Sequence, residues 1–349
     1  MNLHYSEFME NEYYTDVLYI CKETKNGGYD RSMPSMITEI EYFSWVKLLR
    51  FGGILCHMKL TFLGTGTSHG IPVIACDCPV CTSSDPKDQR NRCSVFIEDQ
   101  SSDLHILIDA GPEFRIQAIK YKIKKLDTLL LTHSHADHLH GVDDIRIFSC
   151  TRPAVSNKPS TKIPVHIYGN DNTISDFRNR FDYMFIIHDG GGGVAHVDLN
   201  SMTPYSTSNP LVIKNCSLVP VDLEHGHTLC TGYVINKKLA YLTDVSRIPE
   251  HSFKRLAHNN PPSAPLEHLI IDGLRPRPHS THFSFDQALE AADRIGAKHT
   301  WITHICHDMC HKDIEKYIEE RLPQYKNLQE IVKNGGTVSP AWDGLEILF

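Results

Sequence analysis

The stretch L-L-L-T-H-S-H-A-D-H-L-H-G, residues 129–141, decides the fold of this chain. Its first three leucines, residues 129–131, predict the end of a buried strand, because the apolar run is short and has no polar face. Imidazole and carboxylate groups follow at once, and both are ligands for zinc, manganese or iron. Alternate residues of an extended chain project to the same side, so His133, His135 and Asp137 can converge on one ion.

His138 directly follows Asp137 and therefore faces away from it unless the chain turns. A turn at this point would let Asp137 and His138 serve a second metal ion beside the first. A histidine-rich surface loop is the alternative interpretation. The position directly after an apolar strand favours a metal site.

Composition and charge exclude several classes of protein. The chain has 349 residues, of which 41% are hydrophobic, as is usual for a globular protein of one large or two small domains. No run of eighteen apolar residues is present, which argues against a membrane span. The net charge is −7 and no stripe of Lys and Arg stands out, so a nucleic acid is not the expected partner.

The cysteines predict a second, separate metal site. Cys76, Cys78 and Cys81 form a tight C-x-C-x-x-C, which is half of a zinc site and needs a fourth ligand from elsewhere. Eleven cysteines are an odd number, and their spacing is not that of a disulfide scaffold. Thiols kept reduced indicate an intracellular, cytoplasmic protein.

These motifs carry a resemblance to a known family. The segment H-S-H-A-D-H at a strand end resembles the signature of the metallo-β-lactamase-fold hydrolases. The opening segment G-T-G-T-S-H-G, residues 64–70, resembles the first strand-and-turn of that fold. The C-x-C-x-x-C motif narrows the resemblance to the PhnP branch, the phosphoribosyl cyclic phosphodiesterases. The implied fold is α/β, a four-layer αββα sandwich with the site at the ends of the inner strands.

The domain boundary is expected near Met58, where K-L-T-F-L begins the first strand. Residues 58–349 then form the hydrolase domain. Residues 1–57 are an N-terminal extension of uncertain order, to which we assign no chemistry. Helices are expected over residues 112–122, over 173–186, and after the capping pattern of Ser284 and Gln287.

The resemblance implies two metal ions in the active site, zinc or manganese, and a structural zinc. By position in the family pattern the first ion is held by His133, His135 and His225, with His227 as the runner-up for the third place. The second ion is held by Asp137, His138 and His304, and Asp244 bridges the two ions. The structural zinc is held by Cys76, Cys78, Cys81 and His307.

Further roles come from the same resemblance. Asp109 is expected beneath the metal site, where it orients the ligands through hydrogen bonds. His282 is expected to contact the substrate phosphate and to protonate the leaving alkoxide, with His279 as a weaker candidate. Asp137 is placed beside His282 at the reacting atoms, although an ionised ligand is a poor general acid. His69, in the opening turn, is read as a loop residue rather than a ligand.

The predicted function is that of a phosphodiesterase acting on a small phosphate ester, cyclic or open. Two cations about 3.5–4 Å apart lower the pKa of a bound water, and the hydroxide attacks phosphorus in line. A tRNA-processing nuclease of the ribonuclease Z type and a thioester or coenzyme-maturation hydrolase like PqqB are the alternatives. A zinc-stapled binding module without catalysis would need a missing ligand. The sequence leaves open the natural ester, the active-site metals, homodimer formation, and the role of the glycine run at residues 190–193.

Overall fold

The computed structural model describes residues 58–149, 163–186, 195–261 and 264–349. The predicted extension at residues 1–57 and the glycine run at 190–193 lie outside these ranges. No helix in the described part of the chain is long and apolar enough to cross a membrane.

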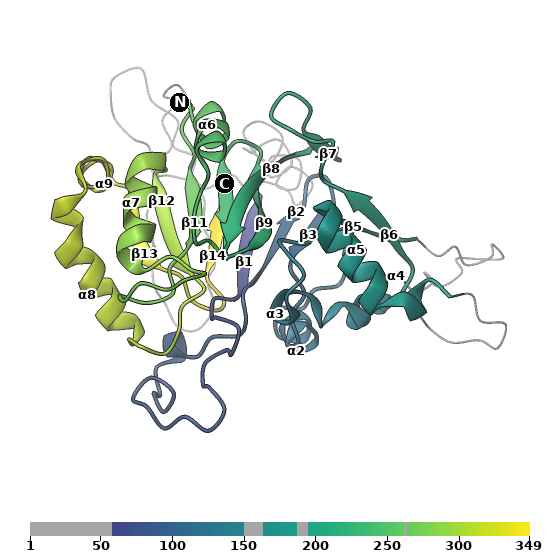
Figure 1. The fold of residues 1–349 in the computed structure, drawn as a ribbon, viewed down its shortest axis with the longest axis horizontal. Coiled ribbons are helices and arrows are strands. Elements are labelled where there is room, and N and C mark those ends of the chain that lie inside the picture. Colours follow the sequence, from purple (N-terminus) through teal and green to yellow (C-terminus); the bar gives the residue numbers. More distant parts are fainter. Residues whose placement is uncertain (1–57, 150–162, 187–194, 262–263) are drawn as a thin grey trace, which may run out of the picture. The chain divides into compact units, whose positions relative to one another are not determined.

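Two seven-stranded mixed sheets form the centre of the fold (Figure 1). The first sheet contains, in spatial order, β14 (Glu346–Leu348), β1 (Lys59–Gly64), β2 (Ser94–Asp99), β3 (Leu104–Ile108), β4 (Thr128–Leu130), β5 (Val165–Gly169) and β6 (Val197–Ser201). The second contains β13 (Thr337–Pro340), β12 (His299–Thr303), β11 (His268–Asp272), β10 (Leu239–Leu242), β9 (Thr228–Ile235), β8 (Cys216–His225) and β7 (Leu211–Ile213).

Helices cover the outer face of each sheet (Figure 1). The first sheet is accompanied by α2 (Phe114–Lys120), α3 (Ala136–Leu139), α4 (Arg146–Ser149) and α5 (Asp171–Arg180). The second carries α6 (Glu250–His258), α7 (Phe285–Ile295), α8 (His311–Arg321) and α9 (Lys326–Lys333). Short 3₁₀ turns occupy Pro86–Asp88, Val142–Ile145, Asp182–Met184 and Leu322–Gln324.

The leucines of the fold-deciding stretch show why the layers form. Leu130 packs into the core between the sheets, whereas Leu129 and Leu131 pack under the helices of the first sheet. All three are fully buried, as expected for a parallel strand covered on both faces. Because successive strand residues alternate between faces, one apolar run contributes to two cores. The predicted αββα sandwich is confirmed.

The predicted helices exist with shifted ends. The helix expected at 112–122 is Phe114–Lys120, and the one expected at 173–186 is Asp171–Arg180 followed by a 3₁₀ turn. Helix α7 begins with the predicted capping box, in which Ser284 accepts from the backbone N–H of Gln287 and the Gln287 side chain accepts from the Ser284 N–H.

The topology gathers several strand ends at one edge. β3 and β4 run parallel in the first sheet, and β10, β11 and β12 run parallel in the second. The residues that follow these strands include Asp109, Asp244 and His304, which adopt positive φ angles of 62°, 57° and 59°. Side-chain-bearing residues held in this region cost on the order of 1–3 kcal/mol each and cluster at functional sites.

Candidate metal centre

The chain turns sharply after β4, as the metal-binding interpretation of the sequence requires. His135 lies just before α3 with an extended backbone, φ −66° and ψ 154°, and Ala136 begins the helix. Asp137 and His138 therefore stand in the first turn of a helix. Their side chains no longer alternate with those of His133 and His135, and one loop supplies two groups of side chains.

The first group consists of His133, His135 and His225, whose potential ligand atoms lie within 4.8 Å of one another. The ring centroid of His225 lies 5.2 Å from that of His133 and 5.0 Å from that of His135. Nδ1 of His225 donates a hydrogen bond to the carbonyl oxygen of Thr281 at 2.7 Å. This contact fixes the tautomer of His225 and leaves its Nε2 lone pair available.

The second group consists of Asp137, His138, Asp244 and His304, also within 4.8 Å. Asp244 faces both sides of it: Oδ2 lies 3.3 Å from Nε2 of His138, and Oδ1 lies 3.3 Å from Nε2 of His304. The two groups are adjacent, since the ring centroids of His133 and His138 are 4.4 Å apart. The arrangement is typical of a binuclear metal site.

The residues fit a pair of cations. Nε2 of His133, His138 and His304 is buried without a hydrogen-bond partner in the described part of the chain, which is costly unless something else is bound there. Burial lowers the pKa of His133 well below its ordinary value and also lowers that of His304, which favours the neutral imidazole that binds metal.

Two carboxyl groups of the centre, those of Asp137 and Asp244, have lowered pKa values. Burial alone would raise the pKa of Asp137 and Asp244, but the neighbouring His138 charge lowers both below the ordinary range. Asp244, Asp137 and Asp109 together raise the pKa of His138 well above its ordinary value despite burial. This concentration of negative charge in a buried site favours cations.

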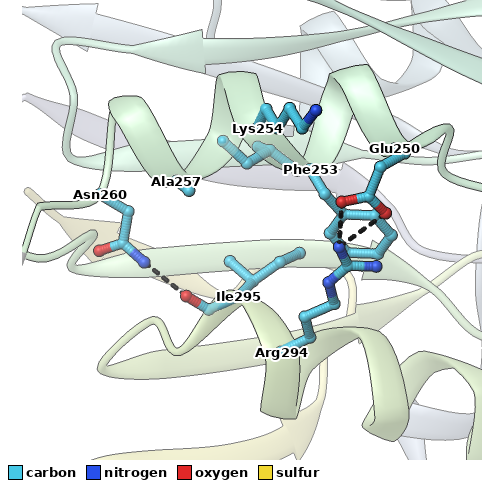
Figure 2. Close-up of a pocket in the computed structure, with 8 residues that line it drawn as sticks. Glu250, Phe253, Lys254, Ala257, Asn260, Arg294 and Ile295 are labelled. Carbon is cyan, nitrogen blue, oxygen red and sulfur yellow. Dashed lines mark hydrogen bonds and ion pairs between the residues drawn. The ribbon is translucent and has the colours of Figure 1, made fainter.

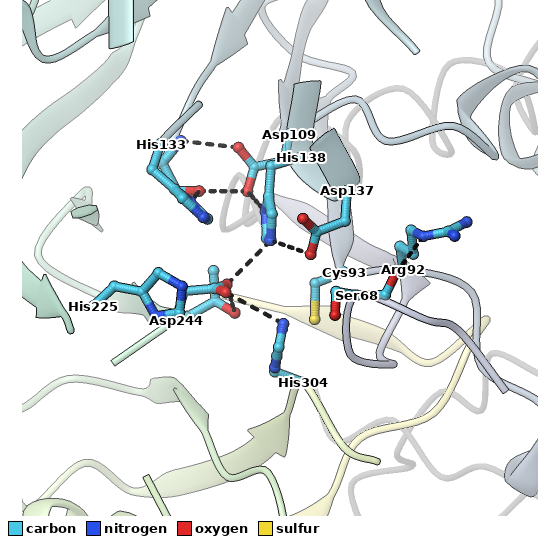
Figure 3. A network of polar contacts seen from close by, with 12 residues as sticks. Ser68, Arg92, Cys93, Asp109, His133, Asp137, His138, His225, Asp244 and His304 are labelled. Atoms are coloured by element: carbon cyan, nitrogen blue, oxygen red, sulfur yellow. Dashed lines mark hydrogen bonds and ion pairs between the residues drawn. The ribbon is translucent and has the colours of Figure 1, made fainter. Parts of the chain in front are cut away.

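Asp109 lies beneath His138, completely buried. Its Oδ2 accepts from Nδ1 of His138 at 2.7 Å and from the Thr132 hydroxyl at 2.8 Å, while Oδ1 accepts from the Thr132 N–H at 2.9 Å. The contact directs Nε2 of His138 towards Asp137 and Asp244 (Figure 3).

His282 stands beside both groups. Its ring stacks on that of His304 with centroids 4.4 Å apart, and its centroid lies 4.6 Å from that of His225. Nδ1 donates to Oδ2 of the buried Asp272 at 2.9 Å. Asp272 also accepts from the Val245 N–H at 2.7 Å, so the carboxylate that holds His282 is itself fixed.

The three predicted thiols meet His307 in a compact group. Nδ1 of His307 lies 3.3 Å from Sγ of Cys76, 3.5 Å from Cys78 and 3.4 Å from Cys81. The Cys81 N–H donates to Sγ of Cys78, and this bond, with contacts from Cys76, Cys81 and His307, lowers the pKa of Cys78 to about 6, whereas burial raises that of Cys81 to about 11. A thiolate supported in this way is the form that binds zinc, so the Cys₃His group fits a tetrahedral zinc site.

The comparisons with known proteins agree with this geometry. Residues 105–305 match the beta-lactamase superfamily domain. A solved structure described as a new diphosphatase from the PhnP family is 34% identical, with a TM-score of 0.67, and the match covers 84% of this chain and 97% of that one. The chain belongs to the PhnP family of the beta-lactamase superfamily.

Two curated relatives of this PhnP-family chain carry different names. An octanoyltransferase of Porphyromonas gingivalis is 31% identical over 293 residues, which are 84% of this chain and 52% of that protein. The chain thus spans about half the length of that relative. A ribonuclease Z of Staphylococcus carnosus is 24% identical over 315 residues, covering 78% of this chain and 96% of the relative.

The structure brings together all seven residues predicted for the binuclear centre of this PhnP-family protein, and separately the four predicted for the zinc. Metal binding by each of them stays a prediction. His227, His69 and His279 are exposed, and none of them belongs to a ligand group in the described residues.

Asp272 is a site residue that was not predicted from the sequence. It ends β11 in H-L-I-I-D, just as Asp244 follows the neighbouring β10 in Y-L-T-D. Since β10 and β11 are parallel and adjacent, the shared pattern of an apolar strand ending in aspartate could have indicated it.

A groove between α6 and α7 is lined by Glu250, Phe253, Lys254, Asn260 and Arg294 among others, and its glutamate and arginine pair with each other (Figure 2). It has a volume of about 320 Å³. Arg294 donates to both carboxylate oxygens of Glu250, at 2.6 and 2.8 Å, and its guanidinium lies 3.7 Å from the centroid of the Phe253 ring. The Asn260 amide donates to the carbonyl oxygen of Ile295.

Proposed function

We propose that this chain is a metal-dependent hydrolase that cleaves a phosphodiester bond in a small substrate. The proposal rests on His282, a histidine outside the predicted ligand set whose ring lies against both ligand groups and is fixed by a buried carboxylate. A structural relative described as a diphosphatase of the PhnP family supports chemistry at phosphorus. The thiols of the Cys₃His group must be reduced to bind zinc, which supports a cytoplasmic setting.

The residues have distinct tasks in this reaction. His133, His135 and His225 would hold one divalent cation, Asp137, His138 and His304 the other, and Asp244 both. When bound, two such cations, zinc or manganese, activate a water and neutralise charge on the phosphoryl oxygens.

His282 presents its Nε2 to the substrate, because Nδ1 is taken by Asp272. Burial lowers the pKa of His282 and raises that of Asp272 to about 7, so the role of acid requires that the ring be doubly protonated in the complex with substrate, where Nε2–H would be donated to a phosphoryl oxygen or to the leaving alkoxide. Asp137, held ionised by His138, serves as a ligand and not as the acid.

Hydrolysis of a diphosphate is the second candidate, favoured by the name of the PhnP-family relative. Both reactions break a P–O bond after in-line attack, and they differ only in the leaving group, which is an alkoxide or a phosphate. A phosphate leaving group needs little protonation at neutral pH. Loss of His282 should therefore slow diester cleavage more than diphosphate cleavage.

Turnover assays of the manganese-loaded protein test the proposal. We expect hydrolysis of bis(p-nitrophenyl) phosphate, and little hydrolysis of an acyl thioester or a precursor tRNA, the substrate classes suggested by the alternatives. His282→Ala should lower kcat about 100-fold or more with unchanged metal content. His258→Ala, an exposed histidine on α6, is the control. Thioester turnover without phosphodiester turnover would reject the proposal.

A further inference from the structure

The segment that carries His133 and His135 is held by few bonds of its own backbone. Among the described residues, neither the N–H nor the carbonyl group of His133 or of Ser134 forms a backbone–backbone hydrogen bond. The last such bond before them is that of the Thr132 carbonyl, which accepts from the Thr231 N–H at 2.8 Å. Side chains must therefore fix the two ligands in place.

The rings of these two histidines differ in the support that they receive. His133 is completely buried, and its Nδ1 lies 3.0 Å from the Thr132 hydroxyl. His135 is exposed, and neither of its ring nitrogens has a hydrogen-bond partner in the part of the chain that the structure describes. Ligating imidazoles are normally oriented by such a bond. The direction of the His135 ring thus depends on how its backbone is held.

Helix α5 holds this backbone through Ser134, the residue between the two histidines. The Ser134 hydroxyl donates to Oδ2 of Asp176 at 2.5 Å, and the guanidinium of Arg180 donates to the Ser134 carbonyl oxygen. Asp176 and Arg180 also pair with each other across one helical turn, with Oδ2 and Nη2 3.6 Å apart. The three residues therefore form a closed ring of contacts that binds both the side chain and the backbone of Ser134.

The start of α5 is attached to the same loop. Asn170 caps the helix, since its Oδ1 accepts from the Thr173 N–H at 3.0 Å. Its Nδ2 donates to the Thr231 hydroxyl at 3.1 Å, and the N–H of Thr231 is the donor that binds the Thr132 carbonyl. Because both attachments lie on one helix, α5 sets the position of Ser134 relative to Thr132.

We infer that Asp176 is a positioning residue for the first cation, and that it acts through Ser134 on the two histidines beside it. A hydroxyl bound to a carboxylate at 2.5 Å is a charge-assisted hydrogen bond, which fixes geometry more firmly than a neutral one. The second cation should depend on it less, because His138 lies on α3 and is oriented by Asp109. The inference rests on the metal-binding part of the proposed function.

Calorimetric titration of the metal-depleted protein with manganese tests this role, because the thiolates of the Cys₃His group favour zinc over manganese. In Asp176→Ala, the Kd of one of the two binding steps should rise at least about tenfold, and that of the other less than about threefold. Asp176→Asn should lie between wild type and Asp176→Ala, since its amide oxygen still accepts from Ser134 but carries no charge for Arg180. Asp171→Ala is the matched control. The carboxylate of Asp171, on the same helix, accepts from the Thr203 hydroxyl at 2.8 Å, and Thr203 lies outside the metal-binding loop.

A double-mutant cycle with His135→Ala identifies the ion that is affected. Once this predicted ligand is removed, adding Asp176→Ala should change each remaining Kd less than about twofold. An equal effect of Asp176→Ala with and without His135, or no effect in either protein, would overturn the inference. So would an equal rise of Kd in Asp176→Ala and Asp171→Ala. A wild-type protein that binds no pair of manganese ions would instead contradict the proposed function.

Discussion

At the scale of single residues, two buried carboxyl groups orient histidines of the predicted centre. Asp109 fixes the orientation of His138, and Asp272 fixes that of His282. Both are completely buried and both accept a backbone N–H bond as well. An imidazole that binds a metal or donates a proton must present one particular nitrogen. By bonding to Nδ1, these two aspartates leave Nε2 of each histidine available for that role.

Asp109→Asn should weaken metal binding with only a modest effect on folding. An amide keeps the shape of the side chain but loses the charge that holds the Nδ1 proton of His138. We expect metal affinity to fall about 10- to 100-fold, measured by competition with a chromophoric chelator. Asp99→Asn, at another buried aspartate that accepts from Ser101 and Asn215, should lower stability but leave affinity intact. Equal affinities in Asp109→Asn and wild type would disprove the role.

Asp272→Asn should slow turnover of bis(p-nitrophenyl) phosphate about 10-fold or more through kcat, with metal content and KM little changed. The amide is a weaker acceptor than the carboxyl group for the Nδ1–H of His282, so it holds the ring less firmly in the orientation that presents Nε2. Asp222→Asn is the matched control. Asp222 accepts a hydrogen bond from Nε2 of the exposed His251 at 3.1 Å, and this His–Asp pair is not part of the predicted metal centre. A fall in metal content that matched the fall in kcat would show that Asp272 acts on the metal ligands instead.

At the scale of elements, the sequence predicted what local pattern controls. The strand ending at Leu130, the turn into α3 and the capping box of α7 follow from apolar runs and side-chain–backbone bonds within a few residues. The predicted helix ends are less accurate, since α5 ends at Arg180 and Asp182–Met184 form a 3₁₀ turn instead of continuing it. The hydrogen bond between Asp272 and His282 could not be predicted from local sequence, because it joins the end of β11 to the loop before α7.

His307→Ala tests whether the Cys₃His group binds a metal ion separately from the binuclear centre and stabilises its loop. The loop of residues 67–90 contains one 3₁₀ turn. The contacts of Arg90 and Asp88 anchor its end, and the Cys₃His group with a small apolar cluster around Ile71 and Val80 holds its middle part. The variant should bind one metal equivalent fewer and unfold at a temperature at least about 4 °C lower. Elemental analysis and thermal unfolding measure these quantities.

The binuclear centre should survive that change, because His307 belongs to a different group from His304. Two metal equivalents and the rate of phosphodiester turnover should remain. Loss of all metals together would contradict the separation of the two sites. Cys216→Ser, a buried thiol in the core between the sheets, controls for a general loss of stability.

At the scale of the whole molecule, a single buried arginine connects distant segments. Arg90 donates to the Thr65 hydroxyl at 2.8 Å, to the carbonyl oxygen of Ala341 at 2.6 Å and to Nδ1 of His311 at 3.0 Å. These contacts connect the turn after β1, the segment after β13 and the start of α8. Residues near the two ends of the described domain are thereby held together through one guanidinium, a link that no local sequence pattern predicts.

His311 makes this connection sensitive to acid. Burial, with the charge of Arg90, lowers the pKa of His311 to about 4, although the partly exposed Glu315 lies 3.2 Å from its Nε2. The unfolded chain, with a pKa of 6.5 at this group, binds the proton more readily. The contribution of neutral His311 to the free energy of unfolding is thus fully present above pH 6.5 and is lost as the pH falls towards 4. The loss amounts to about 3 kcal/mol.

His311→Asn keeps an acceptor for Arg90 but does not titrate. The difference in unfolding free energy, wild type minus variant, should fall by about this amount between pH 6.5 and 4 in urea titrations. The pH dependence that comes from the predicted metal ligands is the same in both proteins and cancels in this difference. A difference independent of pH would show that His311 takes up its proton without weakening the link to Arg90.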